Sequence, residues 1–154
     1  MNHSNGLPLT TYNQPMLQPG SKPVLASPSP VAVAERRMNE KLIIYQKPTC
    51  SKCREALRLL RERGVDFEAI NYYEKPLSET DLRALLKKLG MPARDILRKD
   101  EPIARQLGIG KSEFSDEELI SFMAKHPDLI QRPIVVRGAH AVLGRPLENI
   151  EKLL

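Results

Sequence analysis

Both cysteines of the chain, Cys50 and Cys53, stand where a short apolar run meets a helix-like stretch. The run KLIIY at 41–45 is typical of a buried strand, and DFEAINYY at 66–73 alternates as a half-buried strand does. Between them, SKCREALRLLRERG carries apolar residues at helical spacing and ends on Gly64, a common helix stop. A helix that joins two neighbouring strands makes a right-handed crossover, so we predict a β-α-β unit with parallel strands.

Helical patterns dominate the segment that follows this unit. Ser78 with Asp81, and Ser115 with Glu118, have the spacing of a capping box, so a helix should begin at each serine. Both serines are followed by large apolar residues at helical spacing, which indicates a buried face. Residues 91–108 predict one or two further short helices.

The C-terminal part predicts a hairpin and a last helix. PIVV at 133–136 and AVLG at 141–144 flank the turn RGAH, and PLENIEKLL follows them. Strand, helix, strand, helical insertion, hairpin and helix is the order of a thioredoxin-like α/β domain. We therefore predict a mixed sheet of about four strands, with the helical insertion between the β-α-β unit and the C-terminal hairpin.

Residues 1–40 differ in composition from the rest of the chain. They are dense in Pro, Ser, Gln and Asn without a sustained period, and such a composition cannot bury enough apolar surface to offset ordering entropy. We predict a disordered N-terminal tail over residues 1–40 and one domain over residues 41–154. Met38 stands just before the first strand and is an alternative start of the protein.

Composition argues against several classes of function. The net charge is +5, but the chain has no run of Lys or Arg and only 5% aromatic residues, so a nucleic-acid platform is not expected. No stretch reaches the roughly 18 apolar residues that a membrane span needs. Two cysteines do not make a disulfide scaffold and no secretory signal is visible, so we expect a reducing, cytoplasmic location.

The two cysteines differ in their position on the predicted helix. Cys50 lies in the loop at the helix start, and Cys53 lies one turn inside. Free N–H groups and the helix dipole favour an anion at that end, and Lys52 and Arg54 add positive potential, so the Cys50 thiolate should form well below its usual pKa of roughly 8.5. Cys50 is therefore the candidate nucleophile, and Cys53 is the partly covered thiol beside it. A C-x-x-C at a strand-to-helix turn is typical of a redox site.

Two other interpretations of the cysteines are weaker. A structural zinc site needs four ligands, and no second pair accompanies the first, because His3, His126 and His140 are scattered along the chain. No metal site is expected. Free cysteine is often an inert core residue, but that interpretation leaves the spacing and the turn unexplained.

Four separated segments carry a resemblance to a known family. They are YQKPTC at 45–50, DILRKDEP at 95–102, LIQRPIVV at 129–136 and LGRPLE at 143–148. In this order and spacing they closely resemble the arsenate reductase family of the glutaredoxin- and glutathione-coupled type, and the resemblance extends over residues 41–154. Several motifs that match in order are a more specific signal than any one of them.

The resemblance implies a role for each matching residue. The family's nucleophilic cysteine falls on Cys50, and the three arginines that hold the oxyanion fall on Arg98, Arg132 and Arg145. Pro133 matches the cis-proline that faces the nucleophile in thioredoxin-like folds. Arsenate is a tetrahedral anion, and planar guanidinium groups grip such oxygens bidentately, which lysine cannot do.

The family's reaction is the thiol-dependent reduction of arsenate to arsenite. By resemblance, the Cys50 thiolate attacks arsenic and forms a thiol–arsenate adduct, glutathione attacks next as a co-substrate, and glutaredoxin releases arsenite. No bound cofactor is implied. The implied partners are arsenate, glutathione, and glutaredoxin or thioredoxin as the reductant.

Two residues depart from the family pattern. Gln46 stands where well-studied members carry a histidine four residues before the nucleophile, so activation would rest on the helix terminus and the arginines. Cys53 stands where those members lack a cysteine, and it could attack the Cys50 adduct to form an internal disulfide. A thioredoxin- or glutaredoxin-type protein would then be the reductant. The sequence leaves both routes open.

Two alternative functions use the same residues. One is an uncharacterised reductase of the same family that acts on another oxyanion or on a disulfide. The other is an interaction protein similar to the Spx redox regulators, which bind RNA polymerase and sense oxidation through a cysteine pair such as Cys50 and Cys53. Arg98 and Arg145 favour the enzyme, because they complete an anion site that a regulator does not need.

Overall fold

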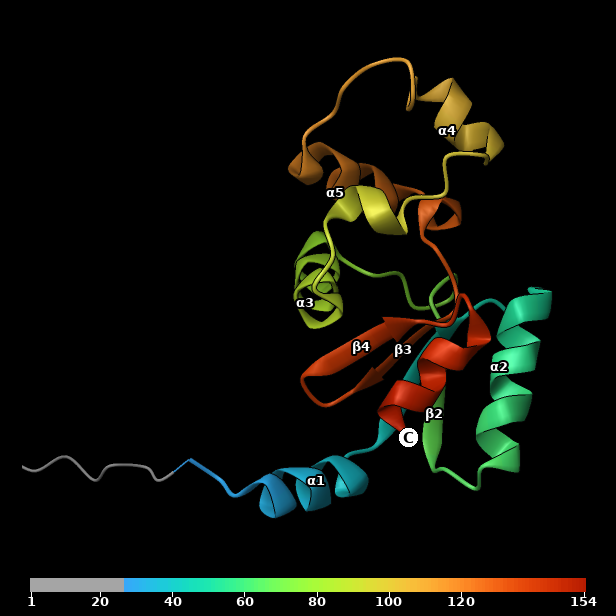
Figure 1. Cartoon of the computed structure of the whole chain (residues 1–154). Helices are drawn as coiled ribbons and strands as arrows, with labels where there is room; N and C mark the ends of the chain where they lie inside the picture. Colours follow the sequence, from blue (N-terminus) through green and yellow to red (C-terminus); the bar gives the residue numbers. More distant parts are fainter. Residues whose placement is uncertain (1–26) are drawn as a thin grey trace, which may run out of the picture.

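Four short strands form one mixed sheet at the centre of the molecule (Figure 1). Their order in space is β2-β1-β3-β4, with β1 parallel to β2 and with β3 antiparallel to both of its neighbours. The strands are β1 (Leu42–Gln46), β2 (Phe67–Asn71), β3 (Ile134–Arg137) and β4 (His140–Leu143). The computed structural model describes residues 27–154, and in this part of the chain the predicted thioredoxin-like mixed sheet is confirmed.

The β-α-β unit carries the two cysteines. Helix α2 (Ser51–Glu62) follows β1, and a φ of 64° at Gly64 turns the chain toward β2. The buried face of α2 includes Ala56 and Leu60, which pack with Ile44 of β1 in one apolar cluster. The predicted parallel pairing of the two strands is confirmed.

Strand β2 is shorter than the strand predicted over 66–73. It ends at Asn71, whose side chain accepts a hydrogen bond of 3.1 Å from the N–H of Tyr73 and closes a turn. The turn buries Tyr72 in the core, with 1% of its surface exposed, and leaves Tyr73 half-buried. Turn chemistry at Asn71 thus overrides the alternating pattern that continues past it.

The helical insertion contains α3 (Glu79–Leu89), η1 (Ala93–Ile96), α4 (Pro102–Gln106), α5 (Asp116–Lys125) and η2 (Pro127–Leu129). Of these elements, α3 packs against β4 on the face of the sheet opposite α2, and the other helices stack beyond α3 (Figure 1). Both predicted capping boxes are confirmed, at Ser78 with Asp81 and at Ser115 with Glu118. Within residues 27–154, no helix is long and apolar enough to cross a membrane.

The chain ends in η3 (Leu147–Leu153), which lies on the same face of the sheet as α2 (Figure 1). The sequence predicts a helix here, and the structure has one in 3₁₀ form. The Asn149 N–H, for example, donates to the Pro146 carbonyl three residues back at 3.1 Å. This element closes the sheet's second face over β3 and β4.

Helix α1 (Pro30–Asn39) occupies part of the segment for which we predict a disordered tail. Residues 1–26, which make up most of that predicted tail, lie outside the described residues. Ser29 Oγ accepts a hydrogen bond of 3.2 Å from the Ala32 N–H, and Pro30 takes the first helical position. Arg137 of β3 donates to the Met38 carbonyl at 3.1 Å. Capping and a tertiary contact, rather than an apolar stripe, account for this helix.

Candidate active site

Cys50 lies at the N-cap of α2, directly after the loop that leaves β1. Its backbone is extended, with φ −81° and ψ 122°, and its N–H donates to the Lys47 carbonyl at 3.0 Å. The Cys50 thiol is partly exposed, whereas Cys53 is fully buried one turn inside the helix, and both are free thiols. The helix start therefore offers one accessible and one covered sulfur.

The two thiols differ widely in acidity. Burial works against the Cys50 thiolate, but the N–H and thiol of Cys53 and the guanidinium of Arg132 outweigh burial and lower the pKa of Cys50 to about 7. Burial raises the pKa of Cys53 to about 11, and the neighbouring Cys50 adds to the rise. Near neutral pH, Cys50 supplies the thiolate and Cys53 the thiol that donates to it.

Arg132 lies two residues before the start of β3, which pairs with β1 and so brings the arginine to the cysteine end of the sheet. The Arg132–Pro133 peptide bond is cis, which confirms the predicted cis-proline. Arg132 Nη1 donates to the Tyr73 hydroxyl at 3.3 Å. Its Nε is buried and has no hydrogen-bond acceptor among the described residues. Arg132 therefore keeps one buried donor, its Nε–H, without an acceptor in residues 27–154.

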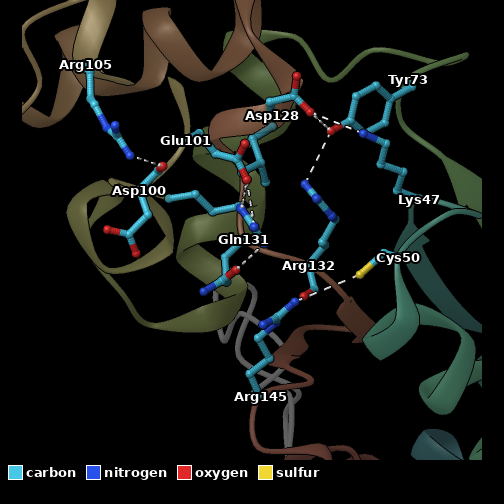
Figure 2. Close-up of polar contacts among 12 residues, drawn as sticks. Lys47, Cys50, Tyr73, Asp100, Glu101, Arg105, Asp128, Gln131, Arg132 and Arg145 are labelled. Atoms are coloured by element: carbon cyan, nitrogen blue, oxygen red, sulfur yellow. Dashed lines mark hydrogen bonds and ion pairs between the residues drawn. The ribbon is translucent and has the colours of Figure 1, made fainter. Parts of the chain in front are cut away.

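Arg145 follows β4 and reaches the same place from the other side (Figure 2). Its Nη2 lies 3.9 Å from the Cys50 sulfur, and its Nε donates to the Arg132 carbonyl at 2.7 Å. The Arg145–Pro146 bond is also cis, which the sequence analysis does not predict. Cys50, Arg132 and Arg145 therefore form one cluster.

Arg98 is held by neighbouring side chains. Its Nη2 forms an ion pair of 2.7 Å with Glu101, and its Nη1 donates to Gln131 Oε1 at 3.2 Å. Arg98 and Arg145 line a common cavity of about 340 Å³, together with Leu97, Lys99, Asp100 and Gln131. In the described part of the chain no hydrogen bond joins Arg98 to Cys50, so this arginine adjoins the cluster through the cavity.

The sequence pattern of the ArsC family matches residues 45–153, a stretch that contains both cysteines and all three arginines. This chain belongs to the ArsC family.

ArsC relatives align with most of the chain. The arsenate reductase of Neisseria meningitidis serogroup B is 39% identical over 112 residues, which are 72% of this chain and 96% of that protein. The uncharacterized protein YfgD of Escherichia coli K12 is 42% identical over 118 residues, which are 76% of this chain and 99% of YfgD. A solved structure of an arsenate reductase from Vibrio cholerae is 40% identical, with a TM-score of 0.71 over 75% of this chain and 98% of that one.

Lys47, Tyr73 and Asp128 form a connected group beside Arg132, and no sequence pattern described above marks them. Tyr73 accepts from Arg132 and donates to Asp128, which forms an ion pair of 3.4 Å with Lys47 (Figure 2). Lys47 follows β1, Tyr73 follows β2, and Asp128 lies in η2. Because they come from three separate elements, no periodic pattern joins them. Lys47 and Asp128 stand near Cys50 and Arg132 in the sequence, but Tyr73 is 59 residues from Arg132 and carries no such signal.

Gln46 is the last residue of β1 and is 7% exposed. Its Oε1 is buried and accepts no hydrogen bond from residues 27–154. A glutamine amide does not gain a proton near neutral pH, so Gln46 cannot act as a titrating group. Activation of Cys50 rests instead on the groups that lower its pKa, Cys53 and Arg132.

Proposed function

We propose that this protein is an arsenate reductase, in which the Cys50 thiolate attacks arsenic while arginines hold the oxyanion. One observation carries the proposal: a partly exposed thiol with a pKa of about 7 has the guanidinium groups of Arg132 and Arg145 beside it. Family membership supports the reaction class, because several relatives of 36% to 39% identity are named arsenate reductase.

In this proposal, arsenate oxygens take the place of acceptors that the arginines lack. Arg132 Nε has no partner within residues 27–154, and Arg145 Nη2 faces the sulfur of Cys50, a weak acceptor, at 3.9 Å. Charged oxygens are much stronger acceptors for guanidinium. Arg98 lines the adjoining cavity, and we assign it an oxygen on that side.

The proposed chemistry balances with two thiols. The Cys50 thiolate forms a sulfur–arsenic bond, and one arsenate oxygen takes up protons and leaves as water. A second thiol then attacks the Cys50 sulfur and breaks its bond to arsenic. Arsenic(V) keeps the electron pair of that bond and becomes arsenic(III), the proton of the second thiol passes to arsenite, and the two sulfurs become one disulfide. Arsenite is released, and the disulfide is reduced by a protein reductant.

We assign the second thiol to glutathione, with glutaredoxin as the protein reductant. Cys53 is fully buried and its pKa is raised to about 11, so it keeps its proton near neutral pH and is a poor attacking group. In this assignment Cys53 donates a hydrogen bond to the Cys50 thiolate. The competing route has Cys53 attack the adduct and a thioredoxin-type protein reduce the internal disulfide.

A redox-sensing regulator similar to the Spx family is the second candidate. It is favoured by the placement of two free thiols at one helix start, where the acidity of each depends on the other. A reductase of another oxyanion would use the same residues as the arsenate reductase.

Arsenate-dependent NADPH oxidation tests the proposal. The reduced protein is assayed with glutathione, glutaredoxin and glutathione reductase, and in parallel with thioredoxin and its reductase. Turnover in the first system, lost in Cys50→Ser, is the expected result. Turnover only with thioredoxin would assign the second thiol to Cys53. No arsenate-dependent NADPH oxidation in either system, together with ready formation of a Cys50–Cys53 disulfide, would favour the regulator.

A further inference from the structure

Behind Arg132, three side chains without a role in the proposed chemistry form a connected series (Figure 2). Arg132 Nη1 donates to the Tyr73 hydroxyl at 3.3 Å, and Tyr73 donates its own proton to Asp128 Oδ1. Lys47 Nζ lies 3.4 Å from the same carboxylate oxygen and 4.3 Å from the centre of the Tyr73 ring. We call Lys47, Asp128 and Tyr73 the Tyr73 chain. It leads to the guanidinium that faces Cys50.

The proton of Tyr73 sets the direction of these hydrogen bonds. A phenol has one proton, so Tyr73 is free to accept from Arg132 because it donates to Asp128. Burial raises the pKa of Tyr73, and the bond to Asp128 raises it further. The Tyr73 donor lowers the pKa of Asp128, and Lys47 and Arg132 also favour the carboxylate. The proton therefore stays on Tyr73, whose lone pair faces Arg132.

The hydroxyls of Tyr73 and Tyr72 hold the end of the Arg132 side chain. Its Nε has no acceptor in the described residues, and Arg145 binds its carbonyl rather than its guanidinium. Tyr72 also faces the guanidinium, and its hydroxyl, which donates to the Ile130 carbonyl at 3.4 Å, is free to accept from Arg132 in the same way. A long side chain with several rotatable bonds loses much conformational entropy when it is held in one place.

We propose that the Tyr73 chain positions Arg132, holding the guanidinium where it stabilises the Cys50 thiolate and meets the substrate oxyanion. In the described structure none of its three side chains bonds to the Cys50 sulfur, so they are positioning residues. The part that concerns the oxyanion rests on the proposed function. The part that concerns the thiolate does not, because thiolate formation is measured without a substrate.

Tyr73 can be substituted without changing any charged or titratable group that faces Cys50. Cys53 faces it from α2, Arg132 from the start of β3, and Arg145 from the segment after β4. Tyr73→Phe removes one hydroxyl and changes none of these charges. A shift in the pKa of Cys50 in that variant must therefore come through the placement of the Arg132 guanidinium.

The experiment follows alkylation of Cys50 by iodoacetamide against pH, in the full chain, with mass spectrometry to identify the modified cysteine. Tyr73→Phe should move the midpoint upward from about 7 by about half a pH unit, and Arg132→Ala at least as far. With Arg132→Ala already present, Tyr73→Phe should add nothing. Tyr45→Phe, the same chemical change on β1, is the matched control and should leave the midpoint in place.

An unchanged midpoint in folded Tyr73→Phe would overturn the proposal, and so would an equal shift with and without Arg132. A second measurement needs no variant: carbon NMR of the tyrosine rings should show Tyr73 still protonated at about pH 11, above the ordinary pKa of about 10. Ionisation of Tyr73 near 10 would contradict the buried, Asp128-bound hydroxyl from which the chain is built.

Arsenate turnover separates the two parts of the inference. Tyr73→Phe should raise the KM for arsenate about tenfold, the loss of roughly one charge-assisted contact, with little change in kcat. A shifted midpoint without any arsenate turnover in the unmodified protein would support the positioning role and refute the proposed substrate. An unchanged KM in Tyr73→Phe, with normal turnover in the unmodified protein, would overturn the oxyanion part.

Discussion

Cys50 gives the protein a pH dependence that follows its thiolate. Because the pKa is lowered to about 7, the reactive fraction should rise as the pH increases through this value and level off about one unit above it. Alkylation of Cys50 measures this directly and avoids the titration of arsenate itself. A midpoint at the ordinary value of roughly 8.5 would contradict the stabilisation by Cys53 and Arg132.

Cys53 is expected to act as a hydrogen-bond donor to the thiolate. Cys53→Ala removes the donor and should raise the pKa of Cys50, whereas Cys53→Ser keeps a hydroxyl and should raise it less. Both variants should keep turnover with glutathione and glutaredoxin. Loss of turnover in both, with the fold intact by circular dichroism, would identify Cys53 as the resolving thiol.

Arg132 should be sensitive to a change that preserves its charge. Lysine cannot make the two parallel hydrogen bonds of a guanidinium, so Arg132→Lys should raise the KM for arsenate about ten- to a hundredfold, equivalent to roughly 1.5–3 kcal/mol. Arg58→Lys, on the exposed face of α2 and paired with Glu62, is the matched control and should behave as the unmodified protein. Equal KM values for the two variants would argue against oxyanion binding by Arg132.

At the scale of elements, the end of β4 packs closely against the residue that follows Arg132. A Cβ atom added at Gly144 would lie 2.7 Å from Pro133 Cγ and 3.3 Å from Ile150 Cδ1. The Gly144 N–H also donates to the Pro133 carbonyl at 2.8 Å. This junction joins the two segments that carry Arg132 and Arg145.

Gly144→Ala should therefore disturb both stability and the site. We expect the free energy of unfolding to fall by about 1–3 kcal/mol, because Pro133 must move to make room. The KM for arsenate should rise as well, since Arg132 moves with Pro133. Urea denaturation and the coupled assay measure the two effects, and full stability in the variant would show that the junction is looser than the structure indicates.

At the scale of the whole molecule, the site exists only when the N-terminal and C-terminal parts of the domain are paired. Cys50 follows β1, whereas Arg132 precedes β3, and the β1–β3 ladder joins them. The helical insertion lies between these strands in sequence, and its helix α3 packs on one face of the sheet. The acidity of Cys50 and the burial of Cys53 are therefore properties of the assembled fold.

Unfolding should remove the difference between the two thiols. In urea we expect both cysteines to be alkylated with a midpoint near the ordinary pKa of roughly 8.5, in place of about 7 and about 11. Modification of Cys53, which has 0% of its surface exposed in the fold, should follow the unfolding transition seen by circular dichroism. Rapid modification of Cys53 without urea would reveal local opening of α2.

Local patterns in the sequence were sufficient for most of the elements. The period of α2, its stop at Gly64 and the two capping boxes depend on residues within a few positions of each other, so spacing alone predicts them. The position of Cys50 at a helix start is local in the same sense. From that position alone, the sequence determined which thiol is the nucleophile candidate.

Tertiary structure decided what surrounds that thiol. Lys47 and Asp128 are 81 residues apart, and Tyr73 and Arg132 are 59 apart, so their contacts depend on how strands and loops pack rather than on any period. Arg98 shows the same limit: its motif marks it as a candidate, but only packing brings Gln131, 33 residues away, to its guanidinium. Spacing along the chain determines the helix terminus that favours a thiolate, and long-range packing determines which charges reach it.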